Sequence, residues 1–120
     1  MKLLLSILED ISSLAIEWYG SYVKKIIVGG KSFETLNERD ETIYLLALDK
    51  VSKISFYARG EIFIFFYNKI LRSSENVKKF IDKYKTLPKI YGIIVEPKEL
   101  DYEMPLFEYL INNGKILFNR

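Results

Sequence analysis

One stretch of this chain, Gly60 to Asn68, limits its fold more than any other. It has the sequence GEIFIFFYN, in which six large apolar or aromatic residues follow one another. A run of this length without polar alternation is typical of a strand whose two faces are both covered. We therefore expect a central strand over 61–67, with cover above and below the sheet.

The residues before this stretch predict a partner strand. Between Lys53 and Arg59, apolar residues alternate with polar ones, as in a half-buried strand. Gly60 then supplies a tight turn, because glycine tolerates the positive φ that two-residue hairpins need. The sequence thus predicts a hairpin of two strands, 53–59 and 61–67.

Helical spacing of apolar residues recurs in three other segments. The first predicted helix has an apolar stripe from Leu4 to Tyr22 and ends near Gly20. The second is capped by Ser73 or Ser74 and ended by Pro88, and the third is capped by Asp101. These helices alternate with the predicted strands, so helices are expected to lie against the sheet.

The remaining segments complete one α/β domain. Strands are predicted over 23–28, 90–95 and 115–118, residues 42–48 form a strand or a buried turn of helix, and residues 31–41 form a loop or a short helix. No repeat or linker divides the chain. Residues 1–120 are therefore expected to form a single three-layer domain, with a mixed sheet of about five to six strands flanked by helices.

The residue types that the chain lacks limit the catalytic and metal-binding chemistry that it can perform. The chain contains no cysteine and no histidine. Disulfides, thiolate ligands and histidine catalysis are therefore excluded, so any catalysis would rest on carboxylates, lysine or tyrosine. The formal net charge is only +2, which excludes a polybasic protein of the histone type. These observations favour a protein that is not an enzyme and that uses no cofactor or metal ion.

The N-terminal run from Met1 to Leu8 lacks the pattern of a signal peptide. It stops at Glu9, and no small-residue cleavage site follows. No stretch approaches the roughly 18 apolar residues of a membrane span. We expect a soluble, cytoplasmic protein without a membrane partner. The composition, rich in Lys, Glu, Ile and Tyr, resembles that of hyperthermophile proteins.

The second half of the chain resembles a known superfamily in its order of elements. The predicted hairpin leads into a serine-capped helix, followed by a strand, YGIIVEP, and a helix ending in NNGKILF. This pattern is similar to the core of the restriction-endonuclease-like superfamily, also called PD-(D/E)xK. The resemblance implies a mixed sheet flanked by helices. In active members, an Asp and a Glu-x-Lys on the hairpin hold a divalent metal ion.

The residues at the positions of that motif do not match it. Lys69 aligns with the motif lysine, but Tyr67 stands where an acid is required. We therefore expect no metal site on the hairpin. The alternative is a metal-dependent nuclease with relocated carboxylates, drawn from Asp49, Glu61 and Glu96, with Lys69 or Lys98 as its lysine. Glu96 and Lys98 do spell Glu-x-Lys, with Asp101 nearby, although a solvated rim at a strand end is the favoured explanation.

A basic segment in the second half suggests a partner. Its residues are Lys69, Arg72, Lys78, Lys79, Lys83 and Lys85. Lysines on one helix face suit the neutralisation of phosphates, so nucleic acid is a predicted partner. A solvated helix face explains the same pattern. So does an acidic protein partner, such as a second copy with its acidic residues between 96 and 108.

Two other features predict association with a protein. Trp18, Tyr19 and Tyr22 cluster at the end of the first helix, and aromatic residues are enriched in interface cores. A small α/β domain also has exposed edge strands, which we expect at 115–118 and 23–28. The sequence thus predicts a non-catalytic accessory or interaction protein. The alternatives are the nuclease with relocated carboxylates, and a structural subunit or homodimer without a nucleic-acid role.

Overall fold

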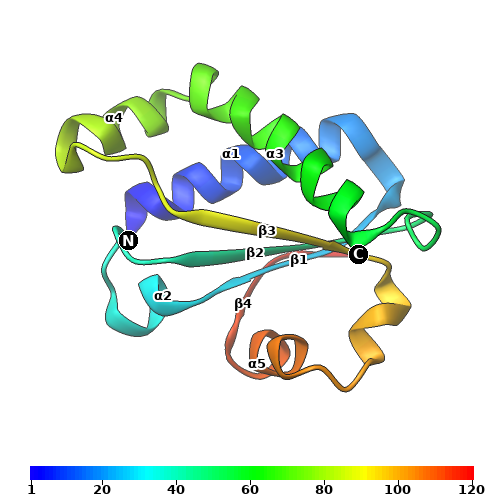
Figure 1. Ribbon diagram of the computed structural model, residues 1–120. Helices are drawn as coiled ribbons and strands as arrows, with labels where there is room; N and C mark the ends of the chain where they lie inside the picture. The colour runs from blue at the N-terminus through cyan, green and yellow to red at the C-terminus, as the bar shows by residue number, and fades with distance from the viewer.

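A mixed sheet of four strands forms the middle layer of the protein in the computed structural model, which describes residues 1–120 (Figure 1). The strands are β1 (Val23–Gly29), β2 (Thr42–Leu48), β3 (Ile90–Val95) and β4 (Lys115–Asn119). They lie in the order β3-β2-β1-β4. β2 and β3 are parallel, whereas β1 runs antiparallel to both of its neighbours. β3 and β4 are therefore the two edges of the sheet.

Helices cover both faces of this sheet, which gives three layers (Figure 1). The helices are α1 (Lys2–Tyr19), α2 (Lys31–Thr35), α3 (Phe56–Ser73), α4 (Glu75–Tyr84) and α5 (Pro105–Asn113), with the short 3-10 helices η1 (Gly20–Tyr22) and η2 (Pro97–Asp101). α1, α3 and α4 lie on one face, and α5 lies on the other. The predicted α/β class is confirmed.

The central strands bury both of their faces. In β2, Tyr44 and Leu46 belong to the core under α1 and α3, while Leu45 and Ala47 pack on the side of α5. The first core also contains Leu4, Ile7, Leu8 and Ile11 of α1, Phe63, Phe66 and Ile70 of α3, and Phe80 of α4, and the second contains Ile27, Val95, Phe107 and Leu110. Burial on both faces explains why β2 is apolar without alternation.

Most of the predicted elements outside the hairpin are confirmed. The first helix ends at Tyr19. The segments 23–28, 42–48, 90–95 and 115–118 correspond to β1 to β4. Ser74 is the N-cap of α4, because its side chain accepts a hydrogen bond from the N–H of Val77. Asp101 was expected to cap the last helix, but it ends η2, and the N-cap of α5 is Met104.

The predicted hairpin of strands 53–59 and 61–67 is wrong. Helix α3 takes up most of these residues, so the sheet has four strands instead of five to six. Ser55 starts this helix, since its Oγ accepts a hydrogen bond from the N–H of Ala58 at 3.2 Å. The buried side chains of α3 recur at the spacing of one helix face, and they are Arg59, Phe63, Phe66 and Ile70.

The apolar run misled the sequence argument because half of it faces solvent. Tyr57, Ile64 and Phe65 are 79%, 57% and 69% exposed, although they flank or belong to the run. A continuous apolar run predicts an element that is buried all round, and α3 is buried along one stripe only. These side chains therefore form an exposed apolar row on the outside of α3.

The hairpin that carried the resemblance to restriction-endonuclease-like proteins is therefore absent. Tyr67 and Lys69 lie on α3. The hydroxyl of Tyr67 donates a hydrogen bond to the carbonyl of Pro88 at 2.9 Å, which ties α3 to the segment before β3. Membership of that superfamily stays a prediction.

Two glycines test how tightly α3 packs on β3. A Cβ on Gly92 would overlap the ring of Phe63, whereas no atom lies within 4 Å of a Cβ on Gly60. We expect Gly92→Ala to lower the free energy of unfolding by about 1–3 kcal/mol through overpacking. The control, Gly60→Ala, should raise it by about 0.5–1 kcal/mol, because alanine favours a helix interior. Urea unfolding measures both; a Gly92→Ala variant as stable as the parent would contradict this packing.

Candidate interaction site at the open sheet edge

β3 is hydrogen-bonded to a neighbouring strand, β2, on one side only. Thr42 pairs with Ile90 in register, and its N–H donates to the carbonyl of Lys89 at 2.9 Å. The backbone groups of successive residues in a strand point alternately to its two sides. The groups that point away from β2 therefore belong to Ile90, Gly92 and Ile94.

Most of these outward groups have no hydrogen-bond partner in the chain. The carbonyl of Ile94 accepts a bond from Nη1 of Arg59 at 3.3 Å. The three outward N–H groups, and the carbonyls of Ile90 and Gly92, have none. Gly92 remains partly exposed although Phe63 covers one side of it. Ile90 and Ile94 are only 6% and 1% exposed, so the chain itself covers their outward groups. The groups that an additional strand can reach are the N–H and the carbonyl of Gly92.

A groove of about 280 Å³ runs along this edge. β3 lines it with Gly92, Ile93 and Ile94, and its walls include Phe56 and Gly60 of α3 and Met104 and Leu106 at the start of α5. Phe56 is 54% exposed and Met104 is 42% exposed. The open strand edge thus lies between two apolar walls.

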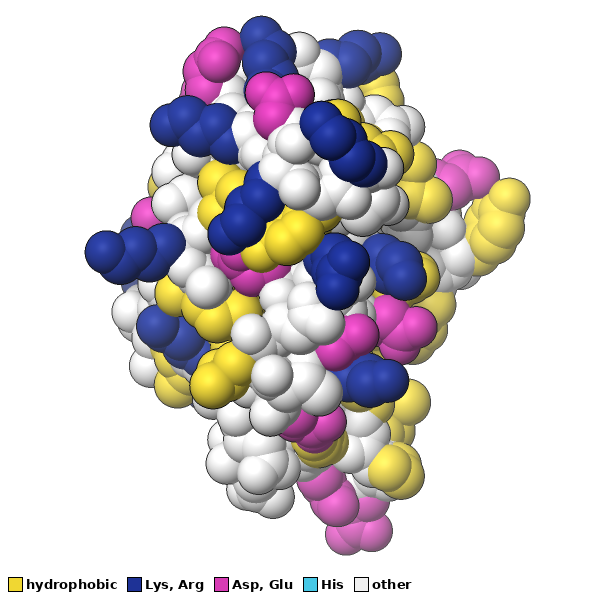
Figure 2. Space-filling model, turned by 90° about the vertical axis from the view of Figure 1, so that its left-hand side faces the viewer, with side chains coloured by type: hydrophobic (Ala, Val, Ile, Leu, Met, Phe, Trp, Pro, Cys, Tyr) yellow, Lys and Arg dark blue, Asp and Glu magenta, His cyan; other side chains and the backbone are white.

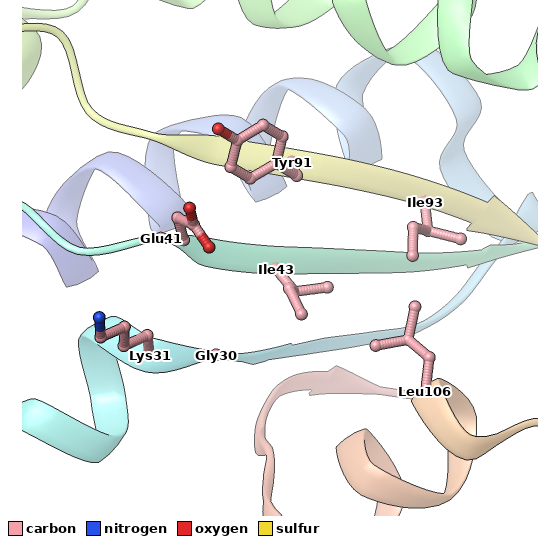
Figure 3. Close-up of a pocket in the computed structure, with 7 residues that line it drawn as sticks. All are labelled: Gly30, Lys31, Glu41, Ile43, Tyr91, Ile93 and Leu106. Atoms are coloured by element: carbon pink, nitrogen blue, oxygen red, sulfur yellow. The ribbon is translucent and has the colours of Figure 1, made fainter.

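A second hollow, of about 400 Å³, lies under β2 and β3 on the α5 face of the sheet (Figure 3). It is lined by Gly30, Lys31, Glu41, Ile43, Tyr91, Ile93 and Leu106. Figure 3 shows Lys31 and Glu41 at one end and Leu106 at the other. Tyr91 is 57% exposed here. Apolar sheet surface is therefore uncovered directly beside the open edge.

A buried ion pair fixes the C-terminal end of β3. Arg59 is only 2% exposed, and its Nη1 lies 2.6 Å from Oε1 of Glu99. The same guanidinium donates to the carbonyls of Val51 and Ile54 at 2.7 and 2.8 Å. With its bond to Ile94, Arg59 connects α3, the loop before it, β3 and η2. This network holds the groove wall of α3 at a set distance from the strand.

Glu96, at the end of β3, anchors the loop that follows β2. Its carboxylate accepts hydrogen bonds from the N–H groups of Lys50, Val51 and Ser52 at 3.2, 2.8 and 3.0 Å. Desolvation acts to raise the pKa of Glu96, but these bonds outweigh it and lower the pKa below its ordinary value. The oxygens of Glu96 are thus engaged by the chain itself.

The other carboxylates of the nuclease hypothesis are not gathered around Glu96. Asp49 lies 3.5 Å from the ammonium of Lys24, and Glu61 is exposed on α3. Lys98 and Asp101 are exposed on η2. No group of three or more acidic side chains in the structure lies close enough to hold a metal ion. The geometry gives no support to a relocated carboxylate site.

The six basic residues predicted to bind nucleic acid lie on α3, on α4 and just after α4, and all are exposed. Two of them have acidic neighbours: Lys78 lies 3.1 Å from Glu75, and Lys83 lies 4.0 Å from Glu38. Figure 2 views the molecule from the end where α4 lies, and shows the basic side chains separated by acidic and apolar ones. Nucleic-acid binding through Lys69, Arg72, Lys78, Lys79, Lys83 and Lys85 stays a prediction.

The aromatic cluster at the end of α1 forms a different surface. The ring of Trp18 lies 5.8 Å from that of Phe65 and 6.2 Å from that of Phe66, centroid to centroid. Tyr19 is half-buried, and desolvation raises its pKa. Tyr22 is 47% exposed in η1. Trp18 and Tyr19 line a hollow against α3 on the side away from β3. Their role in an interface stays a prediction.

The expected edge strands are half right. β4, over 115–119, is an edge, but β1 pairs on both sides and is central. The second edge is β3, which the sequence argument did not name among the edges. Its nearly continuous apolar character indicates only that both of its faces are covered. The sequence carries no signal for this, since α3 covers β3 from above and leaves only its backbone edge free. For the same reason, the sequence did not indicate that Phe56, Gly60 and Met104 line a hollow beside this strand.

Comparisons of the chain with protein-family models, with curated proteins and with solved structures found no match. None of its helices combines the length and apolar character needed to cross a bilayer.

Hydrogen exchange checks the open edge residue by residue. We expect the amides of Tyr91, Ile93 and Val95 to be protected, because they are bonded to β2, and the amide of Gly92 to exchange at nearly the free rate. Nuclear magnetic resonance exchange rates measure this alternation. Equal protection of Gly92 and Ile93 in the monomer would show that the edge is covered.

The Arg59–Glu99 pair predicts a pH dependence of stability. Desolvation acts to raise the pKa of Glu99, but hydrogen bonds from Arg59 and from the N–H of Glu96 lower it below 4.5. The pair therefore stabilises the fold at pH values above the pKa that Glu99 has in the unfolded chain. This stabilisation is lost as the pH falls through the pKa of Glu99 in the folded protein. Glu99→Gln should cost about 3–5 kcal/mol at neutral pH and flatten the acid dependence.

Denaturant unfolding at neutral and acid pH measures this loss. The exposed Glu108 is the control, and Glu108→Gln should change the free energy of unfolding by less than about 0.5 kcal/mol. If both variants lost the same amount, Arg59 and Glu99 would not be the anchor of this edge.

Proposed function

We propose that this protein is a non-catalytic interaction module that binds an extended polypeptide segment as an additional strand along β3. The observation that carries the proposal is the open edge of β3 at the bottom of an apolar groove. Main-chain hydrogen bonds supply affinity in such strand addition, and pockets for alternate side chains supply selectivity.

The backbone of Gly92 supports such bonds. Its N–H and its carbonyl point outward without a partner in the chain, whereas Ile90 and Ile94 on either side are only 6% and 1% exposed. Each hydrogen bond to an incoming strand contributes a net of about 0.5–1.5 kcal/mol. Because Ile94 is held by Arg59 and Gly92 by Phe63, the edge is already extended before binding. Little ordering entropy is then lost on the side of this protein.

The two hollows would receive the side chains of the added strand. Side chains of a strand alternate between its faces. Those on the α3 side would enter the groove beside Phe56 and Gly60, and those on the α5 side would lie near Tyr91 and Leu106. The absence of a side chain at Gly60 leaves room for a partner at the point where α3 approaches the edge. The expected ligand alternates apolar residues and has no proline in its middle.

A display selection tests this proposal. Random dodecapeptides selected on the immobilised protein should be extended, apolar at alternate positions and free of central proline. Gly60→Leu fills the groove and should weaken the selected peptides at least tenfold, a loss of about 1.4 kcal/mol. Ala58→Leu, two residues away on the opposite side of the groove wall, is the matched control and should bind normally.

Methylation of alternate backbone nitrogens in the selected peptides is the second measurement, because it removes donors without changing side chains. Methylation of one set of alternate nitrogens, those that face β3, should abolish binding, and methylation of the other set should leave it unchanged. Equal binding by Gly60→Leu and Ala58→Leu, or indifference to methylation, would refute the proposal. Salt-sensitive binding of duplex DNA that is lost in Lys78→Glu, without any peptide selected, would favour the nucleic-acid alternative.

A further inference from the structure

We infer that the hollow under β2 and β3, on the α5 face of the sheet, binds a small zwitterion, namely an α-amino acid with an apolar side chain. The hollow measures about 400 Å³ and lies open to solvent beside Tyr91, which is 57% exposed. The inference goes beyond the proposed function. It stands on this hollow alone and does not depend on the binding of a strand to β3.

The lining of the hollow contains one cation and one anion, and both lie at the same end. Lys31 begins α2, and Glu41 directly precedes β2. A hydrogen bond of 3.0 Å from the N–H of Ser32 to the carbonyl of Glu41 holds the two segments together. Figure 3 shows both side chains at the end away from Leu106, with the hydroxyl of Tyr91 turned to the same side. Polar groups of both charges therefore converge at one end of the hollow.

These two charges have no partner within the chain. Neither Lys31 nor Glu41 forms a salt bridge, with each other or with any other residue. A ligand carboxylate can therefore pair with Lys31, and a ligand ammonium group can pair with Glu41. Since the two side chains lie at one end, the two ligand charges must be close together, as they are on a single α-carbon.

The other acidic side chains next to this end are already engaged. Asp40 accepts a hydrogen bond from the hydroxyl of Thr35 at 2.7 Å. Glu34 accepts one from the hydroxyl of Tyr109 at 2.5 Å. Glu41 is therefore the carboxylate that remains available to a ligand in this hollow.

Two further cations lie near this end but outside the lining. Arg39 and Lys89 line a separate hollow on the side of α4. Lys89 directly precedes Ile90, which pairs with Thr42, so Lys89 lies close to Glu41 on the neighbouring strand. Its charge adds positive potential at this end, which favours the carboxylate of the ligand. An anionic head group without an ammonium group would leave Glu41 unpaired and facing a like charge.

The remainder of the lining suits an apolar side chain. Ile43 and Ile93 lie on the neighbouring strands β2 and β3, and Leu106 of α5 lies at the far end. The ring of Tyr91 lies along the same strand as Ile93. A largely apolar hollow with a few convergent polar groups is the usual form of a small-molecule site, for which volumes of roughly 300–1,000 Å³ are typical. Burial of a ligand side chain here would remove apolar surface from water.

A titration with L-phenylalanine, followed by nuclear magnetic resonance, locates the binding. We expect a dissociation constant in the millimolar range, because the ligand is small and the hollow is open. The methyl signals of Ile43, Ile93 and Leu106 should shift. Ile64 is equally apolar and 57% exposed, but it lies on α3 at the other face of the sheet, and its signal should not move. Shifts of equal size at Ile64, or none in the hollow, would overturn the inference.

Two analogues that each lack one charge assign the two contacts separately. The analogue 3-phenylpropionate has no ammonium group, and phenethylamine has no carboxylate. Lys31→Met should weaken phenylalanine and phenylpropionate about two- to fivefold, without weakening phenethylamine. Glu41→Gln should weaken phenylalanine and phenethylamine by a similar factor, without weakening phenylpropionate.

Lys2→Met and Glu9→Gln are the matched controls, because both residues are exposed on α1 at the other face of the sheet. They should leave the binding of all three probes unchanged. A lining variant that weakened all three probes equally, or none of them, would overturn the zwitterion site. No peptide takes part in these measurements, so a negative result overturns this inference and leaves strand addition along β3 in place.

Discussion

The rest of the structure depends on the buried pair of Arg59 and Glu99. A lone charge at either position would be costly in the interior, so each requires the other and the hydrogen bonds around them. Arg59 pairs with the carboxylate of Glu99 on η2, and it donates hydrogen bonds to carbonyls of the preceding loop and of β3. Two parts of the chain that are 35 to 40 residues apart, namely the start of α3 with the loop before it and the end of β3 with η2, are thereby held at one corner of the sheet. Glu96 adds the loop after β2 to the same corner through three backbone N–H groups.

This corner decides which part of β3 is covered. Arg59 occupies the carbonyl of Ile94, and Phe63, one helical turn further along α3, packs on Gly92. α3 therefore lies over the strand, so β3 is covered from above and at Ile94, and its edge stays accessible at Gly92. The glycine in the strand allows the close approach of the helix. Gly60 in the helix leaves the entrance to the edge free. An interaction site results from packing that also serves stability.

The same arrangement explains why carboxylates that suggest chemistry in the sequence have structural roles in the fold. Glu96 accepts hydrogen bonds from backbone N–H groups, and Glu99 forms an ion pair with Arg59. Asp49 forms an ion pair with Lys24. The N–H and the carbonyl of Gly92 remain unpaired at the edge of β3. Backbone groups on an extended edge bind another backbone, which is why strand addition is the function that we propose.

The sequence by itself determined the α/β class, the first helix, α4 and the strands β1, β3 and β4, because apolar spacing and caps such as Ser74 act locally. It left residues 42–48 open between a strand and a buried turn of helix. It did not determine the state of residues 61–67. Their continuous apolar run is compatible with a buried strand and with a helix. Only the cap at Ser55 and the buried stripe from Arg59 to Ile70 favour the helix. The position of β3 at an edge, and the partners of Glu96 and Arg59, were decided by the tertiary structure alone. These contacts join residues about 35 to 46 positions apart, and no local pattern encodes which of them meet.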